Sequence, residues 1–331
     1  MNTMAVALRS AITASGWADQ LPGDPRTEDE YAALLTALYE CGRRDLPLGR
    51  LLEGHVDAVQ IMQRYGSATQ VDRLKTVLAR GALLGVWNAG LPGEPLLLDG
   101  HRLTGGKSYA SGAGILTHAL VTADAPGGAQ LLLLDLARVA PVIDRDWWRV
   151  TGMQRSETHQ VRWHDAAITD DDRIGAPGAY AREPYFSGGA LRFVAVHAGG
   201  IAGIVDRTRE HLVSTGRADD PFQSARLAEL FGLAEMAAAI VRRTARLWFE
   251  DGAAEEARLA RVAAARLGVT DAAERAMVIA QAAVGLAGQF LAHPLSAALA
   301  DLTVYLRQPA PDAQRLRVGR AVQMGFLAPS L

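Results

Sequence analysis

Leu83-Leu84-Gly85-Val86-Trp87, followed after a short loop by Leu96-Leu97-Leu98-Asp99-Gly100, is the stretch that decides the fold. Its apolar residues come in short runs between turn-forming residues, which is typical of β-strands. Asp99-Gly100 and Pro126-Gly127-Gly128 are hairpin signals. We therefore expect a strand-rich region over 81–178. Its other strands are expected at 119–121, 131–134 and 161–163.

Both flanks of this region carry the helical period of apolar residues. The first helical part runs from Glu28 to about Arg80. Later helices are expected at 188–214, 221–250, 254–267 and 270–292, then one C-terminal helix lined by Tyr305, Leu306, Leu316, Val318, Val322 and Met324. Segregated helices and strands predict an α+β fold. We expect an N-terminal α-helical domain at 1–80, a central β-barrel-like domain at 81–178 and a C-terminal helical bundle domain at 179–331.

Composition excludes several function classes. The 331 residues carry 34 basic and 36 acidic side chains, so no global positive field attracts nucleic acid. The single cysteine, Cys41, can form neither an internal disulfide nor a thiolate metal cage, so we expect no metal site and a cytoplasmic location. The most apolar long stretch, Ala276–Ala292, is interrupted by Gln281 and Gln289, which indicates a buried helix and no membrane span.

The residues alone leave the type of site open. No nucleotide-binding glycine loop, zinc-binding HExxH or hydrolase GxSxG motif is present. Gly85–Asn88 and Gly106–Gly114 place aromatic rings, hydroxyls and glycines at strand ends, where a planar ligand can approach the backbone. The alternative, which the residues by themselves favour, is a glycine-rich hairpin over a Tyr/Trp core. Likewise His55 beside Glu53 suits acid/base chemistry or a structural role, and His197 fits a core histidine.

Several motifs in chain order resemble the acyl-CoA dehydrogenase family of flavoproteins. They are Leu52–His55 with Tyr65–Gln70, Gly106–Gly112, Gly152–Thr158 with Val161–Asp165, Ile174–Gly178, Gly189–Arg192, Leu233–Ala237 and Gln281–Gly285. The resemblance covers roughly residues 30 to 325 and implies the family's fold, with a C-terminal four-helix bundle and bound FAD. It places Tyr109 against the isoalloxazine ring and the Ser111 hydroxyl near its N5 and O4 edge.

The resemblance also implies contacts from the last domain. Arg217 lies within one position of the family arginine that clamps the FAD pyrophosphate, a role that suits its forked guanidinium. Gln281 and Gly285 match the turn that contacts FAD from a neighbouring subunit, which implies a homodimer or homotetramer. We add Trp87 to the cofactor-binding residues, and we place Glu53 and Arg192 in the substrate site.

The chain departs from the family pattern at the catalytic base. The family's glutamate removes the α-proton of an acyl thioester, but its two alternative positions fall here at Gln308 or Pro309 and at Ala190, Leu191 or Phe193. The catalytic residue is therefore unknown, with Glu53 and Glu157 as replacements to consider. A second departure is the loop 88–95, which lacks the threonine hydroxyl expected at the flavin.

Three functions follow from these patterns. The first is an FAD-dependent oxidoreductase acting on an acyl thioester such as acyl-CoA. The second is a non-catalytic subunit in a hetero-oligomer with a catalytic homologue, which the missing glutamate favours. The third is a flavin monooxygenase or oxidase on the same fold, which needs no α-proton base.

Overall fold

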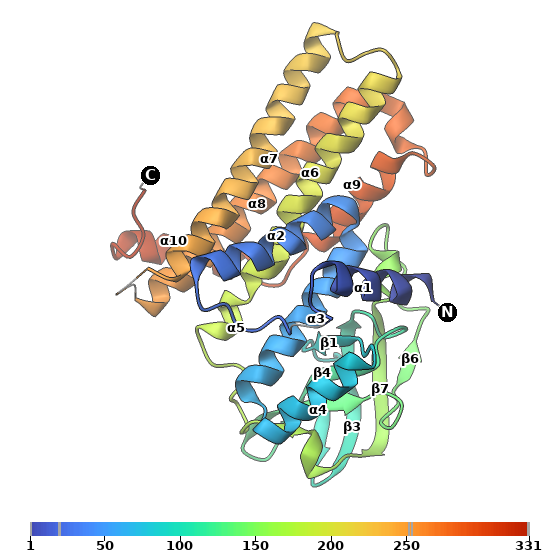
Figure 1. The fold of residues 1–331 in the computed structure, drawn as a ribbon, viewed down its shortest axis with the longest axis vertical. Coiled ribbons are helices and arrows are strands. Elements are labelled where there is room, and N and C mark those ends of the chain that lie inside the picture. Colours follow the sequence, from blue (N-terminus) through green and yellow to red (C-terminus); the bar gives the residue numbers. More distant parts are fainter. Residues whose placement is uncertain (1, 19–20, 251, 253, 330–331) are drawn as a thin grey trace. The chain divides into compact units, whose positions relative to one another are not determined.

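The computed structural model describes residues 2–18, 21–250, 252 and 254–329. Helices come first, strands follow and helices end the chain (Figure 1), so the segregated α+β arrangement is confirmed. The first helices are α1 (Thr3–Ala14), α2 (Glu28–Arg44), α3 (Leu46–Tyr65) and α4 (Ala68–Ala79). Ser67 and Gln70 form a capping box at the start of α4, which satisfies backbone N–H groups that a helix start leaves unpaired.

The described residues form an eight-stranded sheet in the order β6-β7-β3-β2-β4-β5-β8, with β1 paired to β4. The strands are β1 (Leu84–Trp87), β2 (Leu97–Asp99), β3 (Arg102–Ala110), β4 (His118–Ala125), β5 (Gly128–Asp135), β6 (Val142–Asp144), β7 (His159–Ala167) and β8 (Arg173–Ile174). Antiparallel pairing of β2 with β3 and of β4 with β5 confirms both predicted hairpins. The short strands β6 and β8, like helix α1, were not predicted, because elements this short or this close to a chain end carry little periodicity.

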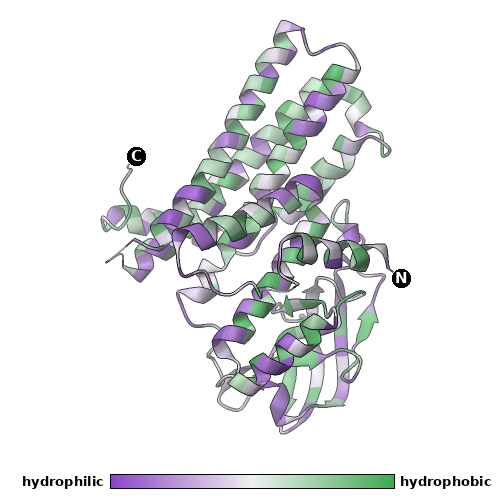
Figure 2. Ribbon diagram, in the orientation of Figure 1, coloured by the Kyte–Doolittle hydropathy of each residue, from purple (hydrophilic) through white to green (hydrophobic). Residues whose placement is uncertain are grey.

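The later helices are α5 (Tyr185–Gly188), α6 (Ala190–Ser214), α7 (Pro221–Trp248), α8 (Glu255–Val284), α9 (Pro294–Tyr305) and α10 (Pro311–Gln323). Short 3₁₀ turns lie at η1 (Gln154–Ser156), η2 (Asp170–Asp172) and η3 (Gly285–Gln289). In Figure 2 these helices alternate between hydrophobic and hydrophilic residues along their length, the pattern of helices with one buried face.

The chain divides into two compact units. The sheet unit comprises Met1–Asp24, Arg50–Arg149 and Gln154–Arg182, and the helical unit comprises Pro25–Gly49, Val150–Met153 and Glu183–Leu331. Because α2 belongs to the unit of the C-terminal helices, the units interleave along the sequence. The division into three consecutive domains at 1–80, 81–178 and 179–331 stays a prediction.

In the sheet unit, α3 and α4 cover one side of the sheet. Ala58, Val59, Ile61 and Met62 of α3 and Leu74 of α4 are buried in one cluster with residues of four strands. Those strand residues are Leu84, Leu120, Leu131 and Ile174. The helical face of α3 is thus fixed against β1, which places its first turns beside the end of β3.

In the helical unit, α6 is the central helix and packs against α2, α7, α8 and α9. It is long and apolar enough to cross a membrane, yet 78% of its most apolar window, within Tyr185–Ser214, lies buried in the fold. Glycines allow its close approach to α2, since a Cβ on Gly199 would lie 2.0 Å from the carbonyl oxygen of Tyr39. Its apolar composition is therefore accounted for by helix packing.

Three predictions about the last helices were wrong. The expected helices at 254–267 and 270–292 are the single helix α8. Gly268, which suggested a break, lies inside the helix, where a Cβ would approach Ile240 to 3.1 Å. Helix α8 ends at Gly285, whose φ of 74° no L residue adopts easily, so the second half of Ala276–Ala292 is not helical and is largely exposed.

The expected C-terminal helix is two helices. Helix α9 ends at Tyr305 and α10 starts at Pro311. Pro309 and Pro311 lack the backbone N–H that a continuous helix needs. Tyr305 and Leu306 are buried, whereas Leu316, Val322 and Met324 are more than half exposed.

Candidate functional site

The last residues of β3 present an exposed aromatic ring. Tyr109 has a φ of 52° and its side chain is 58% exposed. Its ring meets those of Trp147 and Trp148 edge to face, with centroid distances of 5.0 and 6.2 Å. A left-handed backbone at a non-glycine residue costs on the order of 1–3 kcal/mol and clusters at functional sites. We call these three rings the aromatic cluster.

Ser111, two residues later, is fixed by a chain of hydroxyl groups. Thr158 Oγ1 donates a hydrogen bond to Ser111 Oγ at 3.1 Å, and Ser156 Oγ lies 2.7 Å from Thr158 Oγ1. Because Thr158 uses its proton on Ser111, Ser156 is the donor in the second bond. Backbone bonds from Gly112 to Ser156 and from Ala113 to Glu157 hold the same turn. The Ser111 proton is therefore available to a group outside this chain of hydroxyls.

Trp87 is a core residue. Its indole is 1% exposed, packs on Trp163 and donates a hydrogen bond through Nε1 to the Ser111 carbonyl oxygen at 2.9 Å. Trp87 therefore fits the alternative given in the sequence analysis, in which the aromatic residues form a core under a glycine-rich hairpin. Its effect on a site at the turn is to position Ser111.

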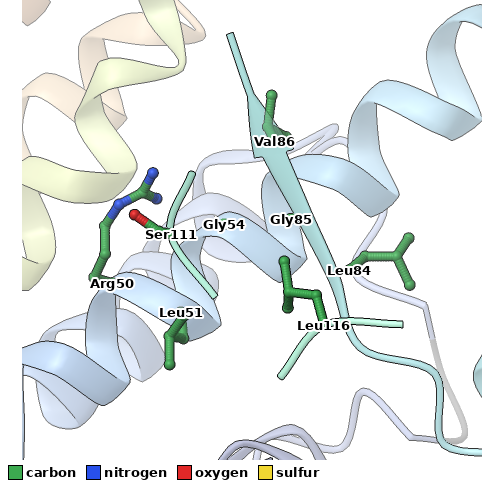
Figure 3. A pocket seen from close by; sticks show the side chains of 8 residues that line it. All are labelled: Arg50, Leu51, Gly54, Leu84, Gly85, Val86, Ser111 and Leu116. Atoms are coloured by element: carbon green, nitrogen blue, oxygen red, sulfur yellow. The ribbon is translucent and has the colours of Figure 1, made fainter. Parts of the chain in front are cut away.

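A pocket lies between the start of α3, strand β1 and the turn after β3, all within the sheet unit (Figure 3). It is a small depression open to solvent, with a cavity volume of about 10 Å³, room for about one water molecule. Its lining residues are Arg50, Leu51, Gly54, Leu84, Gly85, Val86, Ser111 and Leu116. In Figure 3 the Arg50 and Leu51 side chains of α3 lie on one side of the pocket, and those of Leu84 and Leu116 lie on the other.

Glu53, assigned to the substrate site from the sequence, lies beside this pocket. It is 5% exposed, and its Oε2 accepts a hydrogen bond from Arg50 Nη1 at 2.5 Å. A carboxylate held by a guanidinium is stabilised in its ionised form and is a weak proton acceptor. This pairing argues against Glu53 as a catalytic base.

His55 has the surroundings of a structural histidine. The ring is 1% exposed, and Nδ1 accepts a hydrogen bond from the Leu84 backbone N–H at 3.2 Å. Burial lowers the pKa of His55 to about 4, so the imidazole is neutral near pH 7. Its role is to tie α3 to β1 across the base of the pocket.

The loop 88–95 is held down on β3 by a buried lysine and its neighbours. Lys107 Nζ donates to the Asn88 carbonyl oxygen at 3.2 Å and to Thr122 Oγ1 at 2.9 Å, and Thr122 donates in turn to Asn88 Oδ1. Desolvation by burial lowers the pKa of Lys107 to about 8, against a smaller raising effect of Asp124. The loop that departs from the family pattern is thus a fixed part of the sheet unit.

Glu157, the other replacement base considered, is shared among three partners. Its side chain accepts from Arg145 Nη1 at 3.4 Å and from Asn2 Nδ2 at 3.4 Å, and it lies 3.3 Å from His159 Nε2. Glu157 therefore supports the Ser111 turn through structure.

Arg217, Gln281 and Gly285 lie at one end of the helical unit. Arg217 is exposed in the turn between α6 and α7, where Gln223 accepts a hydrogen bond from its Nη2 at 2.6 Å. Gln281 and Gly285 are exposed at the end of α8. His293, which follows η3, lies 3.0 Å from His211 of α6 through their ring nitrogens, so the end of α8 and the α6–α7 turn belong to the same end of the bundle.

Arg192 and the positions expected for a base also lie in the helical unit. Arg192 is 8% exposed on α6. Leu191 is fully buried, and Phe193 stacks under Arg266 at 5.5 Å. Gln308 turns its amide back to the Tyr305 carbonyl oxygen at 2.8 Å. None of these positions holds a carboxylate.

Sequence reasoning missed three parts of the sheet-unit site. Trp147 and Trp148 stand in a loop without periodicity, and Arg50 was passed over for its neighbours on α3. Ser156 and Thr158 lie inside a family motif, but the sequence does not show that their hydroxyls form a hydrogen-bonded chain that ends at Ser111. The pattern Trp147-Trp148 was the one available signal, because two adjacent tryptophans outside the predicted strands are uncommon. No group of three or more His, Cys, Asp or Glu side chains placed to hold a metal ion occurs among the described residues.

Comparisons with known proteins define the class of fold. No family model matches the chain. The chain is similar over nearly its whole length to the butyryl-CoA dehydrogenase of Megasphaera elsdenii, with a TM-score of 0.77, 16% identity, and coverage of 97% of this chain and 89% of that one. The chain therefore has the acyl-CoA dehydrogenase-like fold, as expected from its motifs.

Within that fold, other similar proteins are monooxygenases. A crystal structure of TdsC from a Paenibacillus species with FMN and indole matches with a TM-score of 0.79 and 18% identity, covering 98% of both chains. TdsC is described as a dibenzothiophene monooxygenase. By sequence, the dibenzothiophene monooxygenases of Mycolicibacterium goodii and Rhodococcus erythropolis are each 25% identical over 214 residues, 57% of this chain. The match spans about half, 51%, of the length of these relatives.

Proposed function

We propose that this protein is a flavin-dependent monooxygenase that uses reduced flavin and dioxygen on a small, largely apolar substrate. One observation carries the proposal: the pocket beside Ser111 presents hydrogen-bond donors, and the carboxylate next to it, Glu53, is neutralised by Arg50. Oxygen transfer needs such donors and no α-proton base. The similarity to dibenzothiophene monooxygenases supports the same choice.

The residues of the sheet unit fit a flavin. The aromatic cluster offers an exposed flat surface at Tyr109, which suits an isoalloxazine ring. The Ser111 hydroxyl, with its proton free of the chain behind it, suits the N5 and O4 edge. FMN or FAD satisfies both contacts, and similar structures hold one or the other.

When bound, a reduced flavin would supply two electrons to dioxygen, one oxygen atom of which enters the substrate while the other leaves as water. The protein's own part is positioning. Ser111 donates a hydrogen bond at the reacting edge, and Trp87 and Thr158 hold Ser111 in place. Leu51, Leu84 and Leu116 give the pocket an apolar wall.

We assign Arg217 to the flavin phosphate, and Gln281 and Gly285 to contacts made on a neighbouring subunit. The end of α8 and η3 exposes Leu286 at 77%, Phe290 at 64% and Leu291 at 95%. Apolar exposure of this kind marks interaction sites, so we propose at least a homodimer in the cytoplasm.

An acyl-CoA dehydrogenase activity is the second candidate, favoured by the fold that the chain shares with butyryl-CoA dehydrogenase. The positions expected for the catalytic glutamate hold other residues in this chain, namely Gln308, Ala190, Leu191 and Phe193. Loss of a general base typically lowers the rate about 10²–10⁴-fold. A non-catalytic subunit that completes the site of a catalytic homologue is the reading left if no flavin chemistry is found.

The first experiment purifies the full chain and measures bound flavin by its visible spectrum. Reduced FMN and FAD are then supplied with oxygen and with dibenzothiophene or indole, and oxygenated product is measured by mass spectrometry. Acyl-CoA substrates are tested without oxygen for bleaching of the flavin, on the wild type and on Gln308→Glu. Product that depends on oxygen and on Ser111 supports the proposal. Bleaching by acyl-CoA in the wild type contradicts it.

A further inference from the structure

We propose that the hydrogen-bonded rings of His211 and His293 are a pH-sensitive switch in the helical unit. While both rings are neutral, they hold residues 285–293 to helix α6, and they release this segment when they take up a proton. The two residues are 82 positions apart in the chain. The inference deepens the proposed function, and its consequence for assembly rests on that function, because the same segment carries the surface assigned to a neighbouring subunit.

The histidine pair is the tie between this segment and α6. The turn η3 packs on α8 and α9, its neighbours in the chain, and the backbone N–H groups of Phe290 and His293 bond to carbonyl oxygens of the segment itself. Among the described residues, no other side-chain hydrogen bond joins 285–293 to α6, whereas His293 Nε2 lies 3.0 Å from His211 Nδ1. Loss of this bond would therefore leave the segment without its polar contact to α6.

The direction of each hydrogen bond in the pair follows from the start of α9. His293 Nδ1 accepts from the Leu295 backbone N–H at 3.1 Å. A ring nitrogen that accepts carries no proton, so the proton of neutral His293 lies on Nε2 and is donated to His211 Nδ1. The proton of His211 then lies on its own Nε2. An additional proton can enter the pair only where it breaks the bond between the rings or the cap of α9.

The charges around His211 also oppose an additional proton. Burial lowers the pKa of His211, and the nearby His293 and Arg217 lower it further. From α7, Arg226 brings a second guanidinium to this end of the unit, since Arg217 Nη2 and Arg226 Nη1 both donate to the Gln223 side-chain oxygen, at 2.6 and 3.3 Å. A proton on His211 would thus add a cation to a region that is already cationic.

The carboxylates at this end have other roles. Glu210 of α6 lies 3.9 Å from Arg209, and Asp220 accepts from the first backbone N–H groups of α7. Asp219 is exposed in the turn between these helices. Residues 285–300, which form η3 and most of α9, contain no charged side chain besides His293 when it is protonated. A cation on the pair would therefore be uncompensated.

The sign of the pH effect follows from these contacts. Because the pKa of His211 in the fold lies below the ordinary histidine value of about 6.5, the pair is complete above that pH. It is lost as pH falls further. A proton on His211 Nδ1 would face the His293 Nε2–H, so two donors would replace a donor and an acceptor. The bond would become a repulsion, and residues 285–293 would separate from α6.

Hydrogen exchange of the purified full chain tests the release. Mass spectrometry follows a peptide that contains the hydrogen-bonded amides of Phe290, His293 and Leu295. The rates at pH 7 and pH 5 are expressed as protection factors, which remove the direct effect of pH on exchange. We expect protection to fall about 5-fold at pH 5 in the wild type, as the loss of one hydrogen bond allows. Equal protection at both pH values overturns the inference.

Variants assign the effect to the pair. His211→Asn keeps an acceptor oxygen near the position of Nδ1 but does not titrate, so the peptide should stay protected at both pH values. His211→Ala removes the acceptor, so protection should be low at both. His164→Asn, at an exposed site on β7, is the matched control and should keep the response of the wild type. A wild-type response in His211→Asn means that another group titrates, and the inference is then wrong. Thermal unfolding shows that each variant is folded.

Light scattering at the two pH values separates this inference from the proposed function. If residues 285–293 join subunits, the wild type should shift toward monomer at pH 5 and His211→Asn should not. A wild type that is monomeric at both pH values contradicts the proposed subunit contact, while hydrogen exchange still decides on the switch. Neither measurement needs flavin or oxygen, so a failure of the monooxygenase proposal leaves both results intact.

Discussion

Two turns assigned to the cofactor from the sequence differ in how completely their own unit holds them. The turn from Tyr109 to Leu116 in the sheet unit is fixed by Trp87, Thr158 and backbone bonds to 156–157. The turn from Gly285 to Leu291 in the helical unit leaves Leu286, Phe290 and Leu291 largely exposed. The first turn is held in place entirely by contacts within its own unit. The second has the composition of a surface that another chain covers.

The difference teaches where the information for each turn lies. Around Ser111, hydroxyls and glycines from distant positions were brought together by the sheet, so the geometry is rigid and specific. At the end of α8, the backbone conformation is dictated locally by Gly285 with φ 74°, and the side chains make few contacts. Removing one contact should therefore matter more in the first turn than in the second.

The largest expected effect comes from two glycines with similar backbone angles. Gly112 has φ 76° and Gly285 has φ 74°. A Cβ on Gly112 would lie 2.7 Å from Leu116 Cγ, whereas a Cβ on Gly285 meets nothing within 4 Å. Gly112→Ala is expected to lose about 2–5 kcal/mol of unfolding free energy, from strain and overpacking, and Gly285→Ala about 1–3 kcal/mol from strain alone. Urea unfolding measures both, and equal losses would show that the two turns are held alike.

The second effect is a pH dependence in the sheet unit. The pKa of His55 is lowered by burial to about 4, so the unfolded chain takes up the proton first as pH falls. The stability contributed by neutral His55 is complete above about pH 6.5 and is lost as pH falls toward 4, which amounts to about 2 kcal/mol at pH 5. Urea unfolding at pH 5 and 7 checks this. His55→Gln should show a smaller difference between the two pH values, and an unchanged difference would refute the assignment.

The third effect separates the two units through flavin binding. Tyr109→Ala removes ring contact, so it should weaken riboflavin, FMN and FAD alike, by about 10-fold. Arg217→Gln removes a phosphate partner and should weaken FMN or FAD about 10-fold while riboflavin is unaffected. Fluorescence titration gives each dissociation constant. Loss of riboflavin binding in Arg217→Gln would mean that the variant disturbs the fold instead of a phosphate contact.

Substitutions at η3 are expected to change the unfolding free energy least. They are expected to change the oligomeric state most. Leu286→Asp with Leu291→Asp changes exposed side chains, so the unfolding free energy of the isolated chain should move by less than about 0.5 kcal/mol per site. If this surface joins subunits, light scattering should show a shift toward monomer. Val142→Asp, at a site 60% exposed on β6, is the control and should keep the assembly of the wild type.

Particular residues show how far sequence reasoning reached. The hairpins at Asp99-Gly100 and Gly127-Gly128 were predicted because their turn residues act locally. Gly268 misled the helix prediction, since its reason is contact with Ile240 of another helix. Arg50 was missed as a site residue for the same kind of reason: it lines a pocket together with Ser111, 61 positions away in the chain.

The sequence by itself determined the order of helices, strands and helices, the hairpin turns, the helix cap at Ser67 and the loss of a glutamate at the family's base positions. These features depend on local backbone preferences and on residue identity. The tertiary structure decided that His55 is buried and neutral, that Glu53 pairs with Arg50, and that Ser111 accepts a hydrogen bond from Thr158. Ionisation and hydrogen-bond direction depend on burial and on partners far away in the chain, and folding alone brings those together.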